Sequence, residues 1–237
     1  MREVTKLIAK QVSLWESRQR LATADQRPGR KQVGEIYYGP YLLISRQRGS
    51  DGDKIAQAAG GRLGWHVFDR QIVDAVASRA HVRQQLILSL DERARTAFED
   101  TFRSAFEPED IGSENYILYL KQVVLALGHQ GNVVLVGRGA QYMLPAECAL
   151  RVRVVAPAEW RATQIAARLN LPIEEAREQI LQSDTDRQAS VRQYFRQDAN
   201  DPLNYDLVIN TAEVGIEGAA DLVLLALEKK LGVRPQT

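Results

Sequence analysis

The chain contains very little cysteine and histidine for its length. Its 237 residues include one cysteine, Cys148, and three scattered histidines, His66, His81 and His129. One cysteine excludes an internal disulfide and a cysteine-based metal cluster, and the histidines show no ligand spacing. The sequence therefore assigns no residue as a metal ligand.

The chain also lacks a long apolar run and an excess of charge of one sign. No hydrophobic stretch approaches the roughly 20 residues of a membrane-spanning helix. The first residues lack the order of a secretory signal. Lys and Arg total 31 against 30 Asp and Glu, a net charge of +1, so no strong field indicates nucleic acid or a membrane as partner. We expect a soluble cytoplasmic protein that binds neither.

The first part of the chain differs in pattern from the rest. Residues 5–20 carry an apolar stripe among basic residues, which predicts an amphipathic helix, and Pro28 and Gly29 indicate a linker over Ala22–Gly34. We divide the chain into this helix and linker, residues 1–38, and a main domain, residues 39–237. The helix is expected to pack on its own domain or to form a homodimer, and RNA or lipid contact is the alternative.

From Tyr41 onward, short apolar segments alternate with helical patterns. The predicted strands are Tyr41–Ser45, Trp65–Phe68, Asn132–Val136, Arg151–Ala156 and Asp206–Asn210. The predicted helices are Lys54–Leu63, Gln71–His81, Asp91–Phe106, Asn115–Gly128, Ala158–Leu169, Ile173–Gln182 and Ile216–Leu231. Strands separated by helices pair in parallel through right-handed crossovers. The sequence therefore predicts a doubly wound α/β fold with a five-stranded parallel sheet, helices on both faces and a ligand site at the carboxyl ends of the strands.

The segment after the first predicted strand has the organisation of a phosphate-binding loop. It runs from Ser45 to Asp53 and joins a buried strand to a helix. Unpaired N–H groups and the helix dipole favour anions at such a helix start, and Gly49 and Gly52 allow close approach of the backbone. The signature G-x-x-x-x-G-K-[ST] is absent. An ordinary tight turn is the alternative.

Five segments follow one another in a specific order: Ile44–Gly52, Leu63–Arg70, Gly131–Ala140, Ala156–Arg161, and Asp184–Arg187 with Asp201–Thr211. Together they resemble the cytidylate kinase-like family, which are divergent P-loop relatives of the nucleoside monophosphate kinases. The resemblance implies a P-loop kinase fold with an acceptor-binding helical insert at about residues 70–130 and a lid at about residues 183–202. It also implies ATP or another nucleoside triphosphate, Mg²⁺ and a nucleotide acceptor.

The resemblance assigns a role to individual residues. Those of the phosphate loop are Ser45, Arg46, Arg48, Gly49, Ser50, Asp51, Gly52, Asp53 and Lys54. Those of the acceptor site are Asp69, Arg70 and Arg138, and those acting on the transferred phosphoryl group are Arg161, Arg187 and Arg192. Arginine suits this chemistry because its planar fork binds two phosphate oxygens at once.

Some of these residues also have structural explanations. Asp69 would cap a helix that begins at Arg70. Lys54 is expected to be an exposed residue of the first helical turn, and Arg161 would be a surface residue of its helix. Arg138 lies between two glycines after a buried strand, where packing does not explain it, so a functional role is favoured.

The loop departs from ordinary cytidylate kinases at its charged positions. Gly52 stands where the catalytic lysine is expected, Asp53 where a magnesium-binding Ser or Thr is expected, and Asp51 where a glycine is expected. One hypothesis is an ATP-dependent phosphotransferase that acts on a nucleoside monophosphate, cytidylate-like, or a related small acceptor, with arginines replacing the lysine. The alternative is a nucleotide-binding regulatory protein without turnover. A third is an assembly protein with a vestigial pocket.

Overall fold

The computed structural model describes residues 30–34, 36–78, 80–88, 90, 94–96 and 113–235. The helix predicted over residues 5–20 lies outside this part of the chain, as does most of the helix predicted over Asp91–Phe106. Dimer formation through the N-terminal helix therefore stays a prediction.

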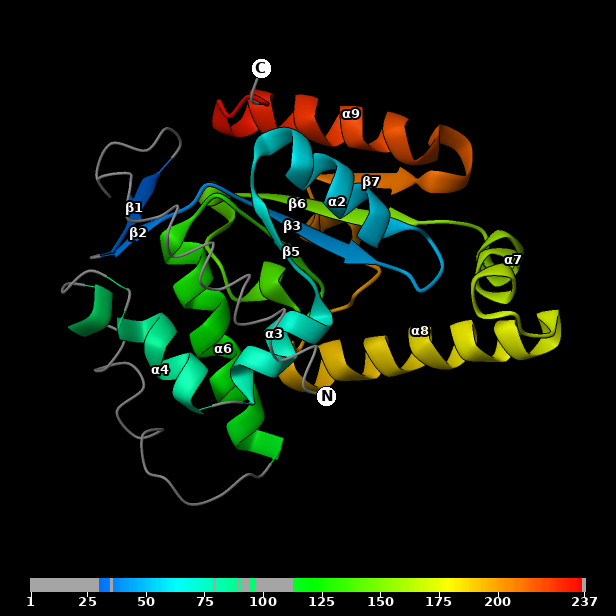
Figure 1. The fold of residues 1–237 in the computed structure, drawn as a ribbon, viewed down its shortest axis with the longest axis horizontal. Helices are drawn as coiled ribbons and strands as arrows, with labels where there is room; N and C mark the ends of the chain where they lie inside the picture. Colours follow the sequence, from blue (N-terminus) through cyan, green and yellow to red (C-terminus); the bar gives the residue numbers. More distant parts are fainter. Residues whose placement is uncertain are drawn as a thin grey trace.

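A five-stranded parallel sheet forms the centre of the domain (Figure 1). Its spatial order is β4 (His66–Phe68), β5 (Val133–Val136), β3 (Tyr41–Arg46), β6 (Ala149–Val155) and β7 (Leu207–Asn210). Every neighbouring pair is parallel, and in the central strand Leu42 aligns with Val134 of β5 and with Leu150 of β6. The five predicted strands and their parallel pairing are confirmed.

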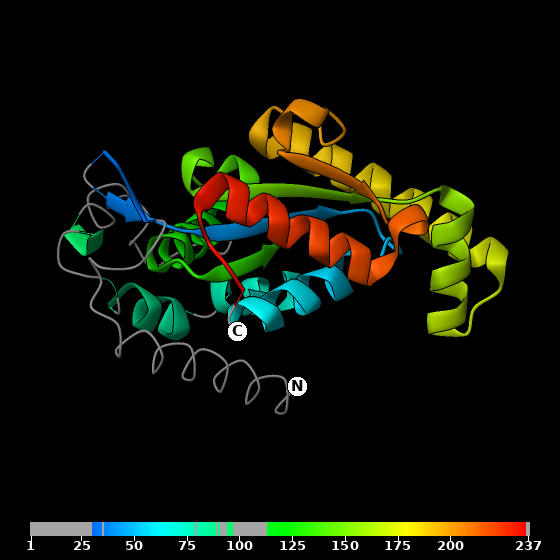
Figure 2. The ribbon, with the colours of Figure 1, turned by 90° about the horizontal axis from the view of Figure 1, so that it is seen from above.

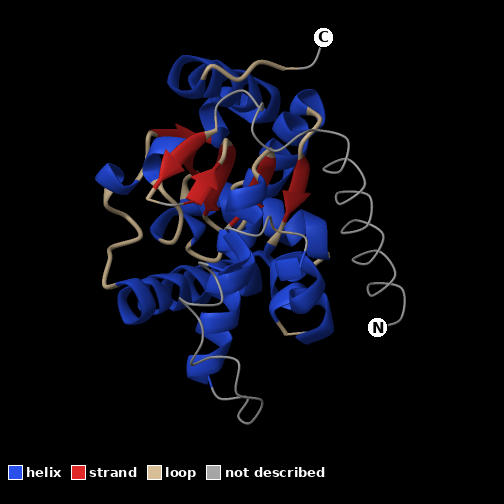
Figure 3. Cartoon of the chain, turned by 90° about the vertical axis from the view of Figure 1, so that its left-hand side faces the viewer, coloured by secondary structure: helices blue, strands red, loops and turns tan. Residues whose placement is uncertain are grey.

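Helices cover both faces of this sheet, as Figure 3 shows from the side. Helices α2 (Gly52–Leu63) and α9 (Thr211–Leu231) pack on one face, over Leu42 and Ile44. Helices α3 (Arg70–Ala77), α4 (Ala80–Leu88) and α6 (Ser113–Gln130) pack on the other, over Tyr41 and Leu43. Successive residues of β3 therefore alternate between two cores, which makes the fold doubly wound.

Helices α7 (Ala158–Leu169) and α8 (Ile173–Phe195) lie beyond the carboxyl ends of the strands (Figures 1 and 2). Short 3₁₀ turns complete the connections: η3 (Ala140–Tyr142), η4 (Ala146–Cys148) and η5 (Pro202–Asn204). The carboxyl edge of the sheet is thus bordered by the loop after β3 and by α8.

Three elements differ from the sequence-based expectation. The expected linker contains a strand, because β1 (Lys31–Val33) and β2 (Ile36–Tyr38) form an antiparallel hairpin. The helix expected over Gln71–His81 is two helices, since α3 ends at Ala77 and α4 begins at Ala80. The helix expected to end at Gln182 continues to Phe195. In the described part of the chain, no helix has both the length and the apolar character needed to cross a membrane.

Candidate active site

A cavity of about 460 Å³ lies between the carboxyl ends of the central strands and helix α8. This volume is in the range of small-molecule sites. Several predicted site residues line it, namely Ser45, Arg46, Arg48, Arg70, Arg138 and Arg187. The structure therefore brings residues from the loop after β3, the start of α3, the loop after β5 and helix α8 to one cavity.

The loop between β3 and α2 has its glycines where close packing requires them. Gly49 has a φ of +83°, and a Cβ there would lie 2.7 Å from the carbonyl oxygen of Arg161. A Cβ on Gly52 would lie 2.5 Å from the Cβ of Arg46. These contacts allow the loop to lie against α7 and against the Arg46 side chain. The glycines are thus explained by packing, and phosphate binding by this loop stays a prediction.

The start of α2 leaves backbone donors available. Asp51 is the N-cap, with a φ of 56°, and its side chain makes no capping hydrogen bond. The Ser50 hydroxyl donates to the Gln47 carbonyl at 2.8 Å and so closes the preceding turn. Among the described residues, none accepts a hydrogen bond from the amides of Gly52 and Asp53. Both amides remain able to donate to an anion.

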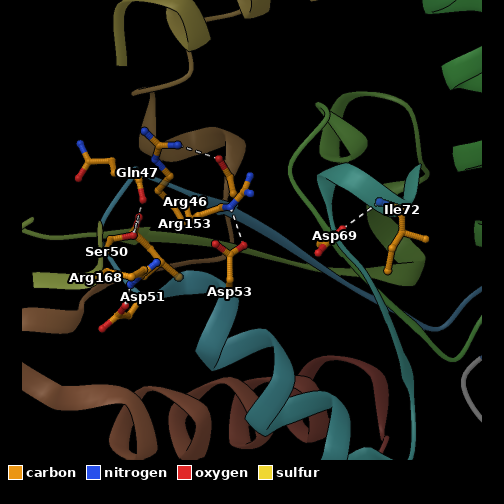
Figure 4. Close-up of polar contacts among 11 residues, drawn as sticks. Arg46, Gln47, Ser50, Asp51, Asp53, Asp69, Ile72, Arg153 and Arg168 are labelled. Atoms are coloured by element: carbon orange, nitrogen blue, oxygen red, sulfur yellow. Dashed lines mark hydrogen bonds and ion pairs between the residues drawn. The ribbon is translucent and has the colours of Figure 1, made fainter. Parts of the chain in front are cut away.

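The carboxylate of Asp51 points away from the cavity. Its side chain is only 4% exposed and makes ion pairs with Arg168 of α7 at 2.5 Å and with Lys54 at 3.2 Å. Asp53 accepts from Arg46 at 3.0 Å (Figure 4). The negative charge of Asp51 is therefore balanced within the protein, and Lys54 is partly exposed, as expected.

Asp69 lines a different, smaller cavity. This second cavity, of about 170 Å³, is also lined by Asp53, Lys54 and Gln57. The Asp69 carboxylate accepts from the amide of Ile72 at 2.9 Å and caps α3 (Figure 4). The helix-cap explanation is confirmed, and a further role of Asp69 in acceptor binding stays a prediction.

Arg138 belongs to a polar cluster on the side of the large cavity that is formed by α3 and α6. Its guanidinium makes an ion pair with Asp74 of α3, and the Tyr116 hydroxyl of α6 donates to the same carboxylate at 2.6 Å. Burial, and then this hydrogen bond, raise the pKa of Tyr116, so the hydroxyl stays protonated. The Arg138 Nε is buried without a partner among the described residues. The Arg138 side chain as a whole is 21% exposed and lines the cavity, so its charge can act on a ligand there.

Neither Asp74 nor Tyr116 was assigned to the site from the sequence. Tyr116 follows Asp74 by 42 positions. Asp69 is the N-cap of α3, and Asp74 lies in the second turn of the same helix. This closeness to a predicted acceptor residue could have identified Asp74 from the sequence.

The three arginines predicted to act on the phosphoryl group have different environments. Arg187 of α8 lines the large cavity. Burial, and then the nearby charges of Arg153 and Arg46, lower the pKa of Arg187 to about 10, so it is still protonated at neutral pH. Arg192 is exposed and does not line this cavity.

Arg161 is buried, 5% exposed, so the surface explanation for it is wrong. It donates to the carbonyls of Ala156 at 3.0 Å and Arg48 at 3.3 Å, and it makes an ion pair with Asp184 of α8 at 2.8 Å. The structure therefore places it between the phosphate loop and the lid, behind the cavity wall.

The sequence interpretation also missed Arg153 of β6. This arginine is 5% exposed and donates to the Ser45 hydroxyl at 2.7 Å and to Asn200 at 3.3 Å. The available signal was the pattern of β6, in which Arg151 and Arg153 alternate with apolar residues. The neighbours of Arg153 on the chain are core residues, which is why the strand was interpreted as packing alone.

The parallel sheet, the strand–loop–helix at its edge and the helical lid define a P-loop kinase-type fold. Residues 42–213 match the profile of the cytidylate kinase-like family. This match covers most of the chain, so the protein belongs to the cytidylate kinase-like family.

Curated relatives carry the name cytidylate kinase. That of Ignicoccus hospitalis is 30% identical over 182 residues, which cover 77% of this chain and 95% of the relative. That of Thermococcus sibiricus is 37% identical over 97 residues, 41% of this chain and 50% of the relative. That of Methanocaldococcus jannaschii is 32% identical over 111 residues, 46% of this chain and 61% of the relative. The match thus spans only about half to three fifths of the latter two relatives.

Among solved structures, an uncharacterized protein from Eubacterium ventriosum has a similar fold. The TM-score is 0.62 at 17% identity, with 82% of this chain and 99% of that chain covered. At this identity the similarity supports the fold alone.

Proposed function

We propose that the protein is a nucleoside triphosphate-dependent phosphotransferase, with ATP as donor and a nucleoside monophosphate, cytidylate or a related small molecule, as acceptor. The observation that supports this is one cavity lined by arginines from three regions. Arg46 and Arg48 come from the loop, Arg187 from the lid and Arg138 from the acceptor side. Such a cavity can hold two phosphate-bearing molecules in contact, which is what phosphoryl transfer requires.

The loop and lid arginines supply the donor side of this proposal. Charge in the transition state spreads over the oxygens of the transferred group, so catalysis depends on positioned cations. Arg46, Arg48 and Arg187 carry such charges, and Arg48 is held toward α8 by Gln179 at 2.8 Å. In this proposal they replace the lysine that is absent at Gly52.

Arg138 supplies the acceptor side. Asp74 orients its guanidinium, and Tyr116 in turn fixes that carboxylate. The guanidinium of Arg138, which lines the cavity and is partly exposed, is the group that we assign to the acceptor phosphate. The arrangement can thus position an acceptor without an additional residue.

The donor set beside α2 fits magnesium. Asp53 and Asp69 line the smaller cavity, and the Asp53 side chain is 56% exposed. Mg²⁺ prefers oxygen ligands and is commonly held by one or two carboxylates and substrate phosphates. The described residues contain no group of three His, Cys, Asp or Glu side chains that could hold a metal ion, so phosphates and water would complete the coordination. When bound, the ion would neutralise charge on the donor phosphates.

A nucleotide-binding regulatory protein is the second candidate, and one observation favours it. Lys54, the lysine of the loop, is not free, because it pairs with Asp51. The charge of Arg46 is likewise shared with Asp53. A pocket of this kind could bind nucleotide without turnover.

Coupled ADP release separates the two candidates. The full chain would be assayed with ATP, Mg²⁺ and a panel of CMP, dCMP, UMP, AMP and GMP, after a thermal-shift screen of the same nucleotides. We expect release with at least one monophosphate, and a slower release in Arg138→Ala when the monophosphate concentration is below its KM. Arg151→Ala is the matched control, because Arg151 pairs with Asp206 and does not line the cavity. Nucleotide binding by wild type without transfer to any monophosphate would establish the regulatory candidate instead.

A further inference from the structure

Arg153 is a buried cation without a carboxylate partner among the described residues. Its guanidinium donates to the Ser45 hydroxyl and the Asn200 side-chain carbonyl, which are both neutral, and it lies 5.8 Å from the centre of the Tyr205 ring. Buried charges are normally paired, because an unpaired ion loses its hydration without compensation. The environment of Arg153 therefore lacks a negative charge.

Two further arginines lie close to Arg153. The pKa of Arg187 is lowered first by burial and then by the charges of Arg153 and Arg46, and the charge of Asp184 offsets this only in part. Nearby carboxylates are already engaged, since Asp53 pairs with Arg46 and Asp184 pairs with Arg161. The lining of the open cavity therefore holds five arginines and one carboxylate, Asp186, so positive charge is in excess there.

The Ser45 hydroxyl connects Arg153 to that cavity. Ser45 lines the cavity, and its Oγ accepts from Arg153 at 2.7 Å. The Tyr205 hydroxyl lies 3.5 Å from the same Oγ, the long limit for a hydrogen bond, and donates to Ala199 at 2.8 Å. The hydrogen of Ser45 is thus available to an acceptor in the cavity.

We propose that Arg153 is the fixed charge of a phosphate subsite whose cavity-facing members are Ser45, Arg46 and Arg187. Its occupant is a phosphate or pyrophosphate group. Taking this group to be part of a nucleotide rests on the proposed function. Arg153 acts as a positioning residue, because it holds Ser45 and contributes positive potential from behind the cavity wall. In this subsite, Arg153 of strand β6 supplies positive charge in place of the lysine that is absent at Gly52.

Titration calorimetry of the full chain with inorganic pyrophosphate tests the subsite, and ADP serves as a second probe. Arg153→Gln should weaken pyrophosphate binding at least tenfold, and Arg153→Lys should recover part of the loss because it restores the charge. Arg151→Gln is the matched control, since Arg151 precedes Arg153 by two residues on β6 and pairs with Asp206 at 2.9 Å. Its affinity should equal that of wild type.

A second readout separates the subsite from a structural role. Without ligand, Arg153→Gln should melt no lower than wild type, because an uncompensated buried charge has been removed. A lower melting temperature with unchanged pyrophosphate affinity would overturn the proposal. If Arg153→Gln does not fold, Arg187→Gln must weaken pyrophosphate binding, and wild-type affinity in that variant would likewise overturn it.

The subsite and the kinase activity can fail separately. Pyrophosphate binding that depends on Arg153 in a protein without transfer activity would support the subsite and exclude the kinase. ADP binding that is weakened together with pyrophosphate binding identifies the nucleotide phosphates as the source of the ligand. Transfer activity in wild type, with pyrophosphate affinity insensitive to Arg153→Gln, would exclude the subsite alone.

Discussion

At the scale of the residue, Arg187 and Arg192 show how a shared helix can give two arginines different roles. Both were predicted from the sequence to act on the phosphoryl group. Arg187 lines the cavity with a depressed pKa, whereas Arg192 is exposed. Under the proposed function, Arg187 is therefore the one of the two that would contact a transferred phosphoryl group.

Replacing Arg187 should therefore mainly affect turnover. We expect Arg187→Gln to lower kcat by roughly 100-fold or more with little change in KM, because a transition-state contact acts on kcat. Arg177→Gln, on the same helix but paired with Glu159 at 2.7 Å, is the control and should behave as wild type. Steady-state kinetics with the best monophosphate measure both. An equal loss in Arg192→Gln would show that α8 presents another face during turnover.

Arg138 should instead determine acceptor affinity. Arg138→Ala removes a charge-assisted hydrogen bond to the acceptor phosphate, which is worth about 1.5–3 kcal/mol. The acceptor KM should rise by roughly tenfold to 100-fold, while the affinity for ATP stays unchanged. Arg62→Ala, an exposed residue paired with Asp221, is the control. A loss of ATP affinity in Arg138→Ala would contradict its assignment to the acceptor side.

Asp51 illustrates what a sequence cannot show about a single residue. Its position beside the loop predicted an unfavourable charge next to a bound anion. In the structure Arg168, which is 117 positions away, pairs with the Asp51 carboxylate and holds it in the protein interior. Local sequence indicates which residue types occur in the loop, but the direction of a side chain depends on partners that only the fold brings near.

At the scale of the element, the sheet was easier to predict than the lid. Strand β5 and the first four residues of β3 are continuous apolar runs, which are typical of strands buried on both faces. Residues 183–190 of α8 are mostly polar, so no apolar stripe marked the second half of this helix. Its position depends on contacts such as Arg161 with Asp184 and Arg48 with Gln179, which are distant in sequence.

The docking of α8 also depends on one glycine. Gly139 has a φ of +66°, and any Cβ there would clash with the Phe195 ring at the end of α8. Gly139→Ala should lower stability by roughly 1–3 kcal/mol and increase hydrogen exchange in α8, because both backbone strain and overpacking result. Gly61→Ala in α2 is the control, since a Cβ there meets open space, and it should stabilise by about 0.5–1 kcal/mol. Unchanged melting and exchange in Gly139→Ala would exclude this docking.

At the scale of the whole molecule, composition and local charge differ. The chain as a whole is nearly neutral, with a net charge of +1, yet its large cavity is lined by several arginines. Composition therefore excluded a general attraction to polyanions but could not reveal a site for a small one. These cations come together because the ends of β3 and β5 and helix α8 border the same cavity. From the strand pattern alone, only a ligand site at the edge of the sheet could be predicted.

A carboxylate at the edge of the sheet, Asp206, makes the stability of the fold depend on pH. Asp206 joins β6, β7 and α9, because it accepts from Arg151 at 2.9 Å and from Lys230 at 2.6 Å. Burial alone would raise the pKa of Asp206, but the hydrogen bonds from Arg151 and Lys230 outweigh it and the pKa is lowered. A carboxylate with a lowered pKa stabilises the fold above its unfolded value of about 3.9 and loses this contribution as the pH falls through the folded value.

Asp206→Asn should thus be less stable than wild type at pH 7, with a difference that narrows as the pH falls below about 4. Urea unfolding at a series of pH values measures this difference directly. Asp221→Asn is the control, because Asp221 of α9 forms an exposed surface pair with Arg62 of α2, and such pairs contribute little at any pH. A difference between wild type and Asp206→Asn that is constant from pH 7 to pH 3 would show that Asp206 stabilises the sheet through its hydrogen bonds alone, without its charge.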